Sequence, residues 1–119
     1  MKNNVEMKNI VLGFLLFLVA FSVNAQETKN KNAVYVFEVN GNCEQCQKRI
    51  QKAALSVSGV KMATWDVETH QIKVVINENK CSLLDVKNAI SNVGHDTDET
   101  KAIDSIYENL HSCCLYKRK

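Results

Sequence analysis

The sequence of 119 residues contains no proline and only four glycines, and it carries no large excess of charge of either sign. Fifteen lysines and arginines stand against thirteen aspartates and glutamates, a balance that argues against a nucleic-acid-binding surface. The longest basic run is the terminal Lys117-Arg118-Lys119, which is typical of a solvated chain end. The apolar run at residues 10–21 stops well short of the roughly 20 residues that a membrane-spanning helix needs. The remaining composition is that of one small globular domain.

The first 25 residues have the pattern of a secretory signal peptide. Lys2 and Lys8 precede the apolar run. After the run, Val23-Asn24-Ala25 offers the small residues at which a signal peptidase cuts. We expect cleavage after Ala25, export to a compartment such as the periplasm, and no stable membrane insertion afterwards; a retained membrane anchor is the alternative. The polar residues 26–32 would then form a flexible tail before the domain.

Hydrophobic periodicity divides residues 33–97 into alternating strands and helices. The order of elements is strand, helix, strand, strand, helix, with Ser82 as the cap of the second helix and Gly94 as its end. The predicted elements are a strand at 33–39, a helix at 45–57, strands at 60–67 and 71–76, and a helix at 83–93. One further strand would complete an α+β fold of the ferredoxin-like βαββαβ type, with two helices on an antiparallel sheet.

Residues 98–119 are predicted to form a C-terminal helical extension with a Cys-Cys tail. Ile103, Ile106, Tyr107 and Leu110 recur at helical spacing, which indicates an extra amphipathic helix. Because residues 95–101 are polar, the missing strand lies either in a fragment just before this helix or at residues 112–116. The sequence leaves both positions open.

Five cysteines in a short exported chain would usually indicate a disulfide framework, but their number and spacing argue against one. Five is odd, Cys43 and Cys46 stand at Cys-x-x-Cys spacing, and Cys113 and Cys114 are adjacent. Thiols kept free for chemistry fit this pattern better. In an oxidising compartment such thiols require a reducing partner or prompt metal binding.

The Cys43-x-x-Cys46 pair has the features of a soft-metal site. Cys43 lies in a loop and Cys46 in the first turn of a helix, so both thiolates can reach one ion. The helix N-terminus, with Lys48 and Arg49 nearby, favours the thiolate form. Thiolates select soft ions, Cu(I) first and Zn(II) and other thiophilic metals after it. Two ligands are too few for a closed structural zinc site, so the pair suits an exchangeable ion.

Two other classes of protein can use the same pair. A thiol-disulfide oxidoreductase would be an enzyme with Cys43 and Cys46 as its redox couple. Proteins of the thioredoxin type place a proline within the motif or a cis-proline facing it, and this chain has none. The other alternative is a structural or regulatory module that its metal only stabilises. We expect a binding protein rather than an enzyme, with no catalytic residues.

Short motifs around the cysteine pair strengthen the metal interpretation. They are Cys43-x-x-Cys46, Arg49-Ile50, Lys52-Ala53, Gly59-Val60, Trp65-Asp66-Val67, Ala89-Ile90 and Gly94-His95-Asp96. Together they resemble the heavy-metal-associated domain of copper chaperones, copper-exporting ATPases and periplasmic mercury-binding proteins, over residues 33–97. The resemblance implies the ferredoxin-like fold, Cys43 and Cys46 as metal ligands, and thiolate exchange of Cu(I), or of Hg(II) or Zn(II), with a metal-transporting ATPase or efflux system.

The sequence departs from that pattern at two places near the site. Asn40-Gly41-Asn42 stands where the family often has Gly-Met-Thr, and His95 replaces an aromatic residue in a turn near the metal loop. We therefore consider His95 as a possible third metal ligand. Cys113 and Cys114 lie outside the pattern and are possible additional ligands, either as a second soft-metal pair or by folding back over the first pair; the alternative is that one of them packs against the extra helix. Two other residues receive no role: Cys81 is expected to be a partly buried structural thiol and His70 an exposed, inert hairpin residue.

Overall fold

The computed structural model describes residues 28–119, which form three strands, three α-helices and one short 3-10 turn. In chain order they are β1 (Ala33–Glu38), α2 (Glu44–Leu55), β2 (Val60–Trp65), β3 (Gln71–Ile76), α3 (Leu83–Asn92), α4 (Asp104–Glu108) and η1 (Ser112–Cys114). The strands and the two longer helices match their predicted ranges to within about two residues. The predicted signal peptide lies outside the described residues.

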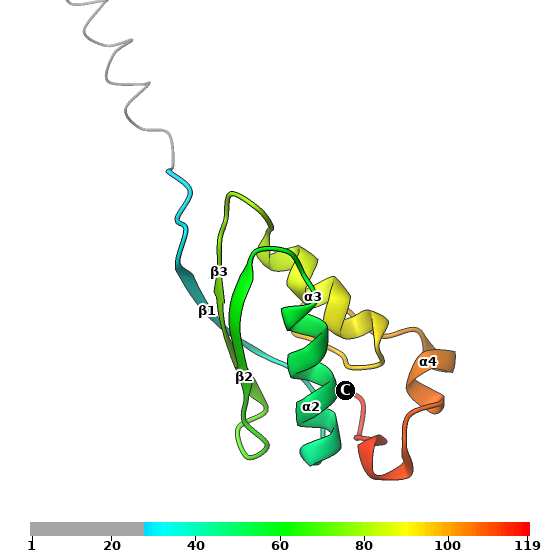
Figure 1. Ribbon diagram of the computed structural model, residues 1–119. Helices are drawn as coiled ribbons and strands as arrows, with labels where there is room; N and C mark the ends of the chain where they lie inside the picture. The colour runs from blue at the N-terminus through cyan, green and yellow to red at the C-terminus, as the bar shows by residue number, and fades with distance from the viewer. Residues whose placement is uncertain (1–27) are drawn as a thin grey trace, which may run out of the picture.

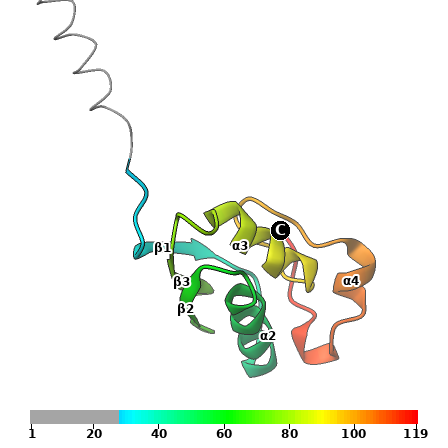
Figure 2. The same ribbon diagram turned by 45° about the horizontal axis from the view of Figure 1, so that its top comes forward.

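The sheet has the order β1-β3-β2, and both pairs of neighbours run antiparallel. In β3, Ile72, Val74 and Ile76 are fully buried while Gln71 and Lys73 are exposed. Because side chains alternate between the faces of a strand, one face of the sheet is apolar. Helices α2 and α3 cover that face (Figures 1 and 2), so the α+β class expected from the sequence is confirmed.

The fourth strand of the ferredoxin-like pattern is reduced, within residues 28–119, to one bridge between Val39 and Thr97. It lies just before α4, the first of the two expected positions, whereas residues 112–114 form a 3-10 turn. After the bridge the Thr97 N–H bonds the carbonyl of Thr100 at 2.8 Å. The pairing itself consists of two hydrogen bonds, from the Asn40 N–H to the carbonyl of Asp96 and from the Asp98 N–H to that of Glu38, and the turn at residues 97–100 follows it directly.

The extra helix α4 is shorter than its hydrophobic spacing predicts. It covers Asp104–Glu108 and buries none of its residues, and Ile103 at its N-cap is 63% exposed. Leu110 does pack against the core, over Gly94. The chain after α3 therefore follows the domain surface, passes the start of α2 at η1 (Figure 1), and then turns back to Lys119, whose side chain pairs with Glu38.

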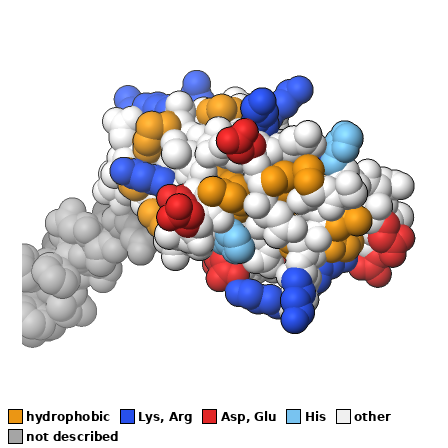
Figure 3. Space-filling model, turned by 90° about the horizontal axis from the view of Figure 1, so that it is seen from below, with side chains coloured by type: hydrophobic (Ala, Val, Ile, Leu, Met, Phe, Trp, Pro, Cys, Tyr) orange, Lys and Arg blue, Asp and Glu red, His pale blue; other side chains and the backbone are white. Residues whose placement is uncertain are grey.

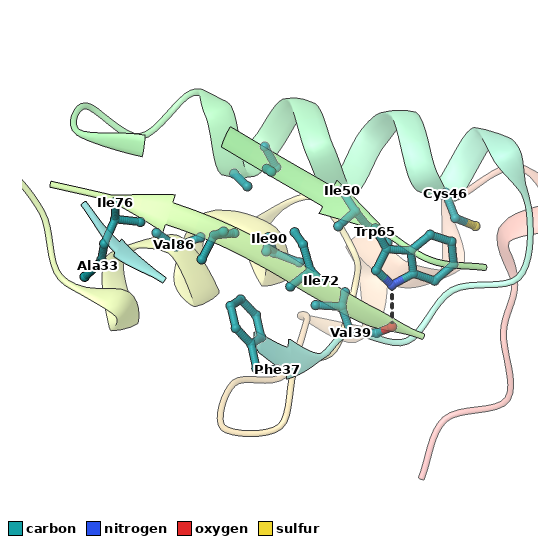
Figure 4. Packing of buried hydrophobic residues seen from close by; sticks show 14 of the residues in the cluster. Ala33, Phe37, Val39, Cys46, Ile50, Trp65, Ile72, Ile76, Val86 and Ile90 are labelled. Atoms are coloured by element: carbon teal, nitrogen blue, oxygen red, sulfur yellow. Dashed lines mark hydrogen bonds between the residues drawn. The ribbon is translucent and has the colours of Figure 1, made fainter. Parts of the chain in front are cut away.

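The core lies between the sheet and the two longer helices, and it reaches the cysteine loop through Trp65 (Figure 4). The indole is fully buried, and its Nε1–H donates a 3.0 Å hydrogen bond to the carbonyl of Val39. That bond satisfies the one polar group of the ring. Trp65 thus joins β2 to the residue that precedes the loop.

Candidate metal centre

The backbone at the start of α2 brings the two loop thiols together. Cys43 is the N-cap in an extended conformation, and its side chain makes no capping hydrogen bond. Cys46 is the third residue of the helix, and its sulfur accepts a hydrogen bond from the N–H of Asn42 at 3.4 Å. The Sγ atoms of Cys43 and Cys46 are 3.5 Å apart. This is far beyond disulfide length, so both thiols are free to bind.

Gly41 allows the loop to pack closely over the core. A Cβ at this position would lie 3.0 Å from the Cβ of Cys46 and 3.1 Å from the ring of Trp65. Any larger residue would therefore push the loop away from the helix. Neither Gly41 nor Trp65 was assigned a site role from the sequence, although Trp65 stands in one of the resembling motifs.

The adjacent cysteines of the C-terminal segment also reach the loop. The Sγ of Cys43 lies 3.2 Å from the Sγ of Cys113 and 3.4 Å from that of Cys114. Within residues 28–119, these three side chains form a group whose possible ligand atoms all lie within 4.8 Å of one another. Of the two thiols, Cys114 is buried and Cys113 is exposed. Four thiols thus meet at one end of the molecule.

The environment separates the pKa values of these thiols. Burial raises the pKa of Cys43, but hydrogen bonds to its sulfur outweigh burial and lower the pKa to about 6; the donors are the N–H of Cys46 and the thiols of Cys113, Cys114 and Cys46. Burial raises the pKa of Cys46 to about 12, and the hydrogen bond to Cys43 raises that of Cys113 to about 11. Cys43 is therefore the thiolate of the cluster near neutral pH.

His95 lies in the core rather than among the thiols. Its side chain is fully buried, its Nδ1 lies 2.8 Å from the carbonyl oxygen of Asn40, and its ring stacks on Tyr116. Burial lowers its pKa to about 4, so the ring is neutral near pH 7. These contacts tie the cysteine loop to the C-terminal segment. The role of His95 as a metal ligand stays a prediction, without support from the described ligand group.

The remaining thiol and imidazole lie apart from the cluster. Cys81 is half-buried immediately before α3 and packs against the core, as its interpretation as a structural thiol requires. His70 is not the freely exposed residue expected from the hairpin. It is half-buried, has φ of 60°, and stacks on Trp65 with ring centroids 5.8 Å apart.

The basic end of the chain is also more ordered than its sequence suggests. Arg118 donates two hydrogen bonds of 2.8 Å to the carboxylate of Asp96 and one to that of Asp104. The expectation of a solvated tail is therefore wrong for Arg118, because Asp96 is a buried acid that needs a cation. The sequence offers only a weak signal, since Arg118 and Asp96 are far apart along the chain.

Residues 36–96 match the heavy-metal-associated domain family. The copper chaperone CopZ of Staphylococcus haemolyticus (strain JCSC1435) is 32% identical over 62 residues, which are 51% of this chain and 91% of that protein.

Two solved structures are similar as well. Oxidized MerP from Ralstonia metallidurans CH34 is 25% identical with a TM-score of 0.54, over 56% of this chain and 94% of MerP. The N-terminal domain of a potential copper-translocating P-type ATPase from Bacillus subtilis, in the Cu(I)-loaded state, is 26% identical with a TM-score of 0.54. The match covers 63% of this chain and 95% of that domain. Because the family match covers half of the chain and includes both loop cysteines, this protein belongs to the heavy-metal-associated domain family.

Proposed function

We propose that this protein is an exported carrier or scavenger of a soft metal ion, Cu(I) in the first place, and that it is not an enzyme. The single observation that carries the proposal is the pair Cys43 and Cys46, with sulfurs 3.5 Å apart at the start of α2. Soft thiolates favour Cu(I), and two ligands leave room for a third from another molecule. Export rests on the signal-peptide pattern of residues 1–25.

Ion transfer by this pair is a ligand exchange. Cys43 is half-buried and has a low pKa, so it is the thiolate that an incoming ion meets first. Cys46 lies behind it at the helix N-terminus, where partial positive charge favours its deprotonation once metal arrives. The oxidation state of Cu(I) does not change; Cys43 binds as the thiolate it already is, and Cys46 releases one proton to water when it binds.

The proposed partner is a metal-transporting ATPase or an efflux system that presents thiols of its own. Support comes from the ATPase domain with the same fold and 26% identity, described in its Cu(I)-loaded state. The face of the molecule seen from below in Figure 1 displays charged side chains of both signs around apolar side chains (Figure 3). A mixed surface of this kind suits a transient protein contact. In residues 28–119 we find no helix with the length and apolar character of a membrane span.

A competition titration tests the proposal. The reduced protein is titrated with Cu(I), Hg(II) and Zn(II) against a chelator of known affinity, beside Cys43→Ser and Cys46→Ser. Cys81→Ser is the matched control, since it removes a thiol outside the cluster. We expect soft ions to bind tightly to the parent and to the control. Their affinity for the two loop variants should be much lower. Tighter selection of Hg(II) over Cu(I) than simple dithiols show would favour the mercury-binding alternative.

A separate assay, the reduction of insulin disulfides, tests the oxidoreductase alternative. Reduction of insulin disulfides at enzyme-like rates, dependent on Cys43 and Cys46, would support it and contradict the carrier. We expect no such activity.

A further inference from the structure

Cys113 and Cys114 lie outside the region that matches the family, which ends at residue 96, yet their thiols contact the loop cysteine Cys43. The turn η1 carries both of them, and the N–H of Cys114 donates a 2.7 Å hydrogen bond to the carbonyl of His111. Their sulfurs are 3.9 Å apart. Both thiols of the pair therefore face the same loop.

Tyr116 fixes the position of this turn on the domain. It is 2% exposed, and its phenol oxygen accepts a hydrogen bond from the N–H of Asp96 and donates one to the carbonyl of Gly94, both at 2.9 Å. Its ring also stacks on His95, which holds the carbonyl of Asn40 in the cysteine loop. The two cysteine segments are thus linked through a buried chain of contacts.

The ion pair between Arg118 and Asp96 holds the same C-terminal segment against the domain. Asp96 is 3% exposed, and its carboxylate also accepts a hydrogen bond from the N–H of Ala102 at 2.8 Å. A buried carboxylate without its cation is strongly unfavourable, so Arg118 has a structural reason to stay in place. The Cys113 and Cys114 thiols are therefore presented by a docked segment.

The spacing of the sulfurs fits a metal bound by more than two thiolates. An ion about 2.3 Å from each of three or four sulfurs keeps those sulfurs about 3.8 to 4.0 Å apart. The distances from Cys43 are 3.2 Å, 3.4 Å and 3.5 Å, and Cys113 to Cys114 is 3.9 Å. For Cys43, Cys113 and Cys114, whose sulfurs all lie within 4.8 Å of one another, outward shifts of roughly half an ångström would accommodate an ion of that size. Cys46 lies outside this group and approaches the ion from the side of Cys43. Rotation about the side-chain bonds of the exposed Cys113 can supply part of them.

We propose that Cys113 and Cys114 act as additional ligands to the ion held by Cys43 and Cys46, and so convert an open two-thiolate site into a closed site of three or four thiolates. This inference rests on the proposed function. The ion remains Cu(I), and each added thiol releases one proton to solvent on binding, so no oxidant or reductant is consumed.

The closed site changes what the protein does with its cargo. During exchange, a partner's thiol must take a coordination position on the ion, and here the docked C-terminal thiols occupy those positions. The protein therefore retains its ion more firmly than a carrier with two ligands, and release to a partner requires displacement of Cys113 and Cys114. Retention of this kind suits a scavenger that holds metal until a competing thiol pair arrives.

X-ray absorption spectroscopy of the full reduced chain with half an equivalent of Cu(I) tests this directly. We expect three or more sulfur neighbours in the parent and two, at shorter distance, in Cys113→Ser/Cys114→Ser. Affinity in competition with a Cu(I) chelator should fall by roughly tenfold or more in the double variant. Cys81→Ser, which removes a half-buried thiol elsewhere, should match the parent in both measurements.

The outcomes separate the inference from the function on which it rests. Two sulfur neighbours and equal affinity in parent and double variant would overturn the closed site and leave the carrier function intact. Absence of Cu(I) binding by the parent would overturn both. Near-ultraviolet circular dichroism of the buried Trp65 and Tyr116 shows that the double variant keeps its fold.

Discussion

The sulfur of Cys113 lies 3.2 Å from the sulfur of Cys43, although 70 positions separate the two residues in the chain. No pattern within either segment requires this approach. It arises because Tyr116 and Arg118 anchor the end of the chain at Gly94 and Asp96, in the turn that follows α3. The same turn passes beside the cysteine loop through the contact between His95 and Asn40.

The first prediction concerns the anchor. Arg118→Gln leaves the buried carboxylate of Asp96 without its cation, and we expect the free energy of unfolding to fall by about 3 kcal/mol, the lower end for a buried pair because the Arg118 side chain is 22% exposed. Urea denaturation followed by Trp65 fluorescence measures the loss. Lys117→Gln, a neighbouring exposed cation, is the control. Equal stability of the two variants would show that the tail is not docked.

The second prediction concerns the reactivity of the metal-free loop. Because the pKa of Cys43 is about 6 and that of Cys46 about 12, a thiol-alkylating reagent should modify Cys43 first, with a rate that rises through pH 6. Peptide mass mapping after brief alkylation between pH 4 and pH 9 identifies the site. In Cys113→Ala/Cys114→Ala, which removes both thiol donors, the midpoint should move to higher pH because those hydrogen bonds lower the pKa of Cys43. Modification of Cys46 before Cys43 would contradict this assignment.

The third prediction concerns stability in mild acid. Burial lowers the pKa of His95 from 6.5 to about 4, so between these values the unfolded chain binds more protons than the folded chain. Stability should therefore fall by about 3 kcal/mol as the pH drops from 6.5 to 4.

His95→Gln tests this, because its amide can bond the Asn40 carbonyl but does not titrate. The pH slope of unfolding free energy over that window should be clearly smaller in the variant. Equal slopes would assign the acid sensitivity to other groups.

The fourth prediction concerns the loop glycine. In Gly41→Ala the new methyl group would meet the Cβ of Cys46 at 3.0 Å and the Trp65 ring at 3.1 Å. Overpacking of this kind costs about 1 to 3 kcal/mol and displaces the loop. We expect lower thermal stability and weaker Cu(I) binding, measured by calorimetry and chelator competition. Exposed Asn42→Ala is the matched control, and a Gly41→Ala protein that binds as tightly as this control would contradict the proposed packing.

The sequence predicts local elements well because their signals are local. Ile72, Val74 and Ile76 alternate in the sequence and are buried in β3, and Cys43 and Cys46 lie at the start of α2 as their spacing indicates. The contacts that complete the cluster depend on distant pairs such as Arg118 with Asp96 and Tyr116 with Gly94. Such pairs have no periodicity, and the docking of the tail could only be raised as an alternative.

The last strand and the last helix illustrate the same limit. Residues 95–101 contain His95 and Asp96, which are buried through long-range hydrogen bonds rather than through strand alternation. The apolar stripe after residue 102 indicates a helix, but only part of it finds a partner: Tyr107 packs edge-on against Tyr116 while Ile103 stays 63% exposed, and α4 ends at Glu108. A hydrophobic pattern predicts an element reliably only where the fold supplies a partner for its apolar face.

Native mass spectrometry of the reduced protein, loaded with Cu(I) in the presence of a competing chelator, tests the central claim most directly. The account predicts one tightly held Cu(I) per chain for the parent and for Cys81→Ser, and none for Cys43→Ser/Cys46→Ser. A double loop variant that retains Cu(I) as well as the parent does would contradict the assignment of Cys43 and Cys46 as the metal site.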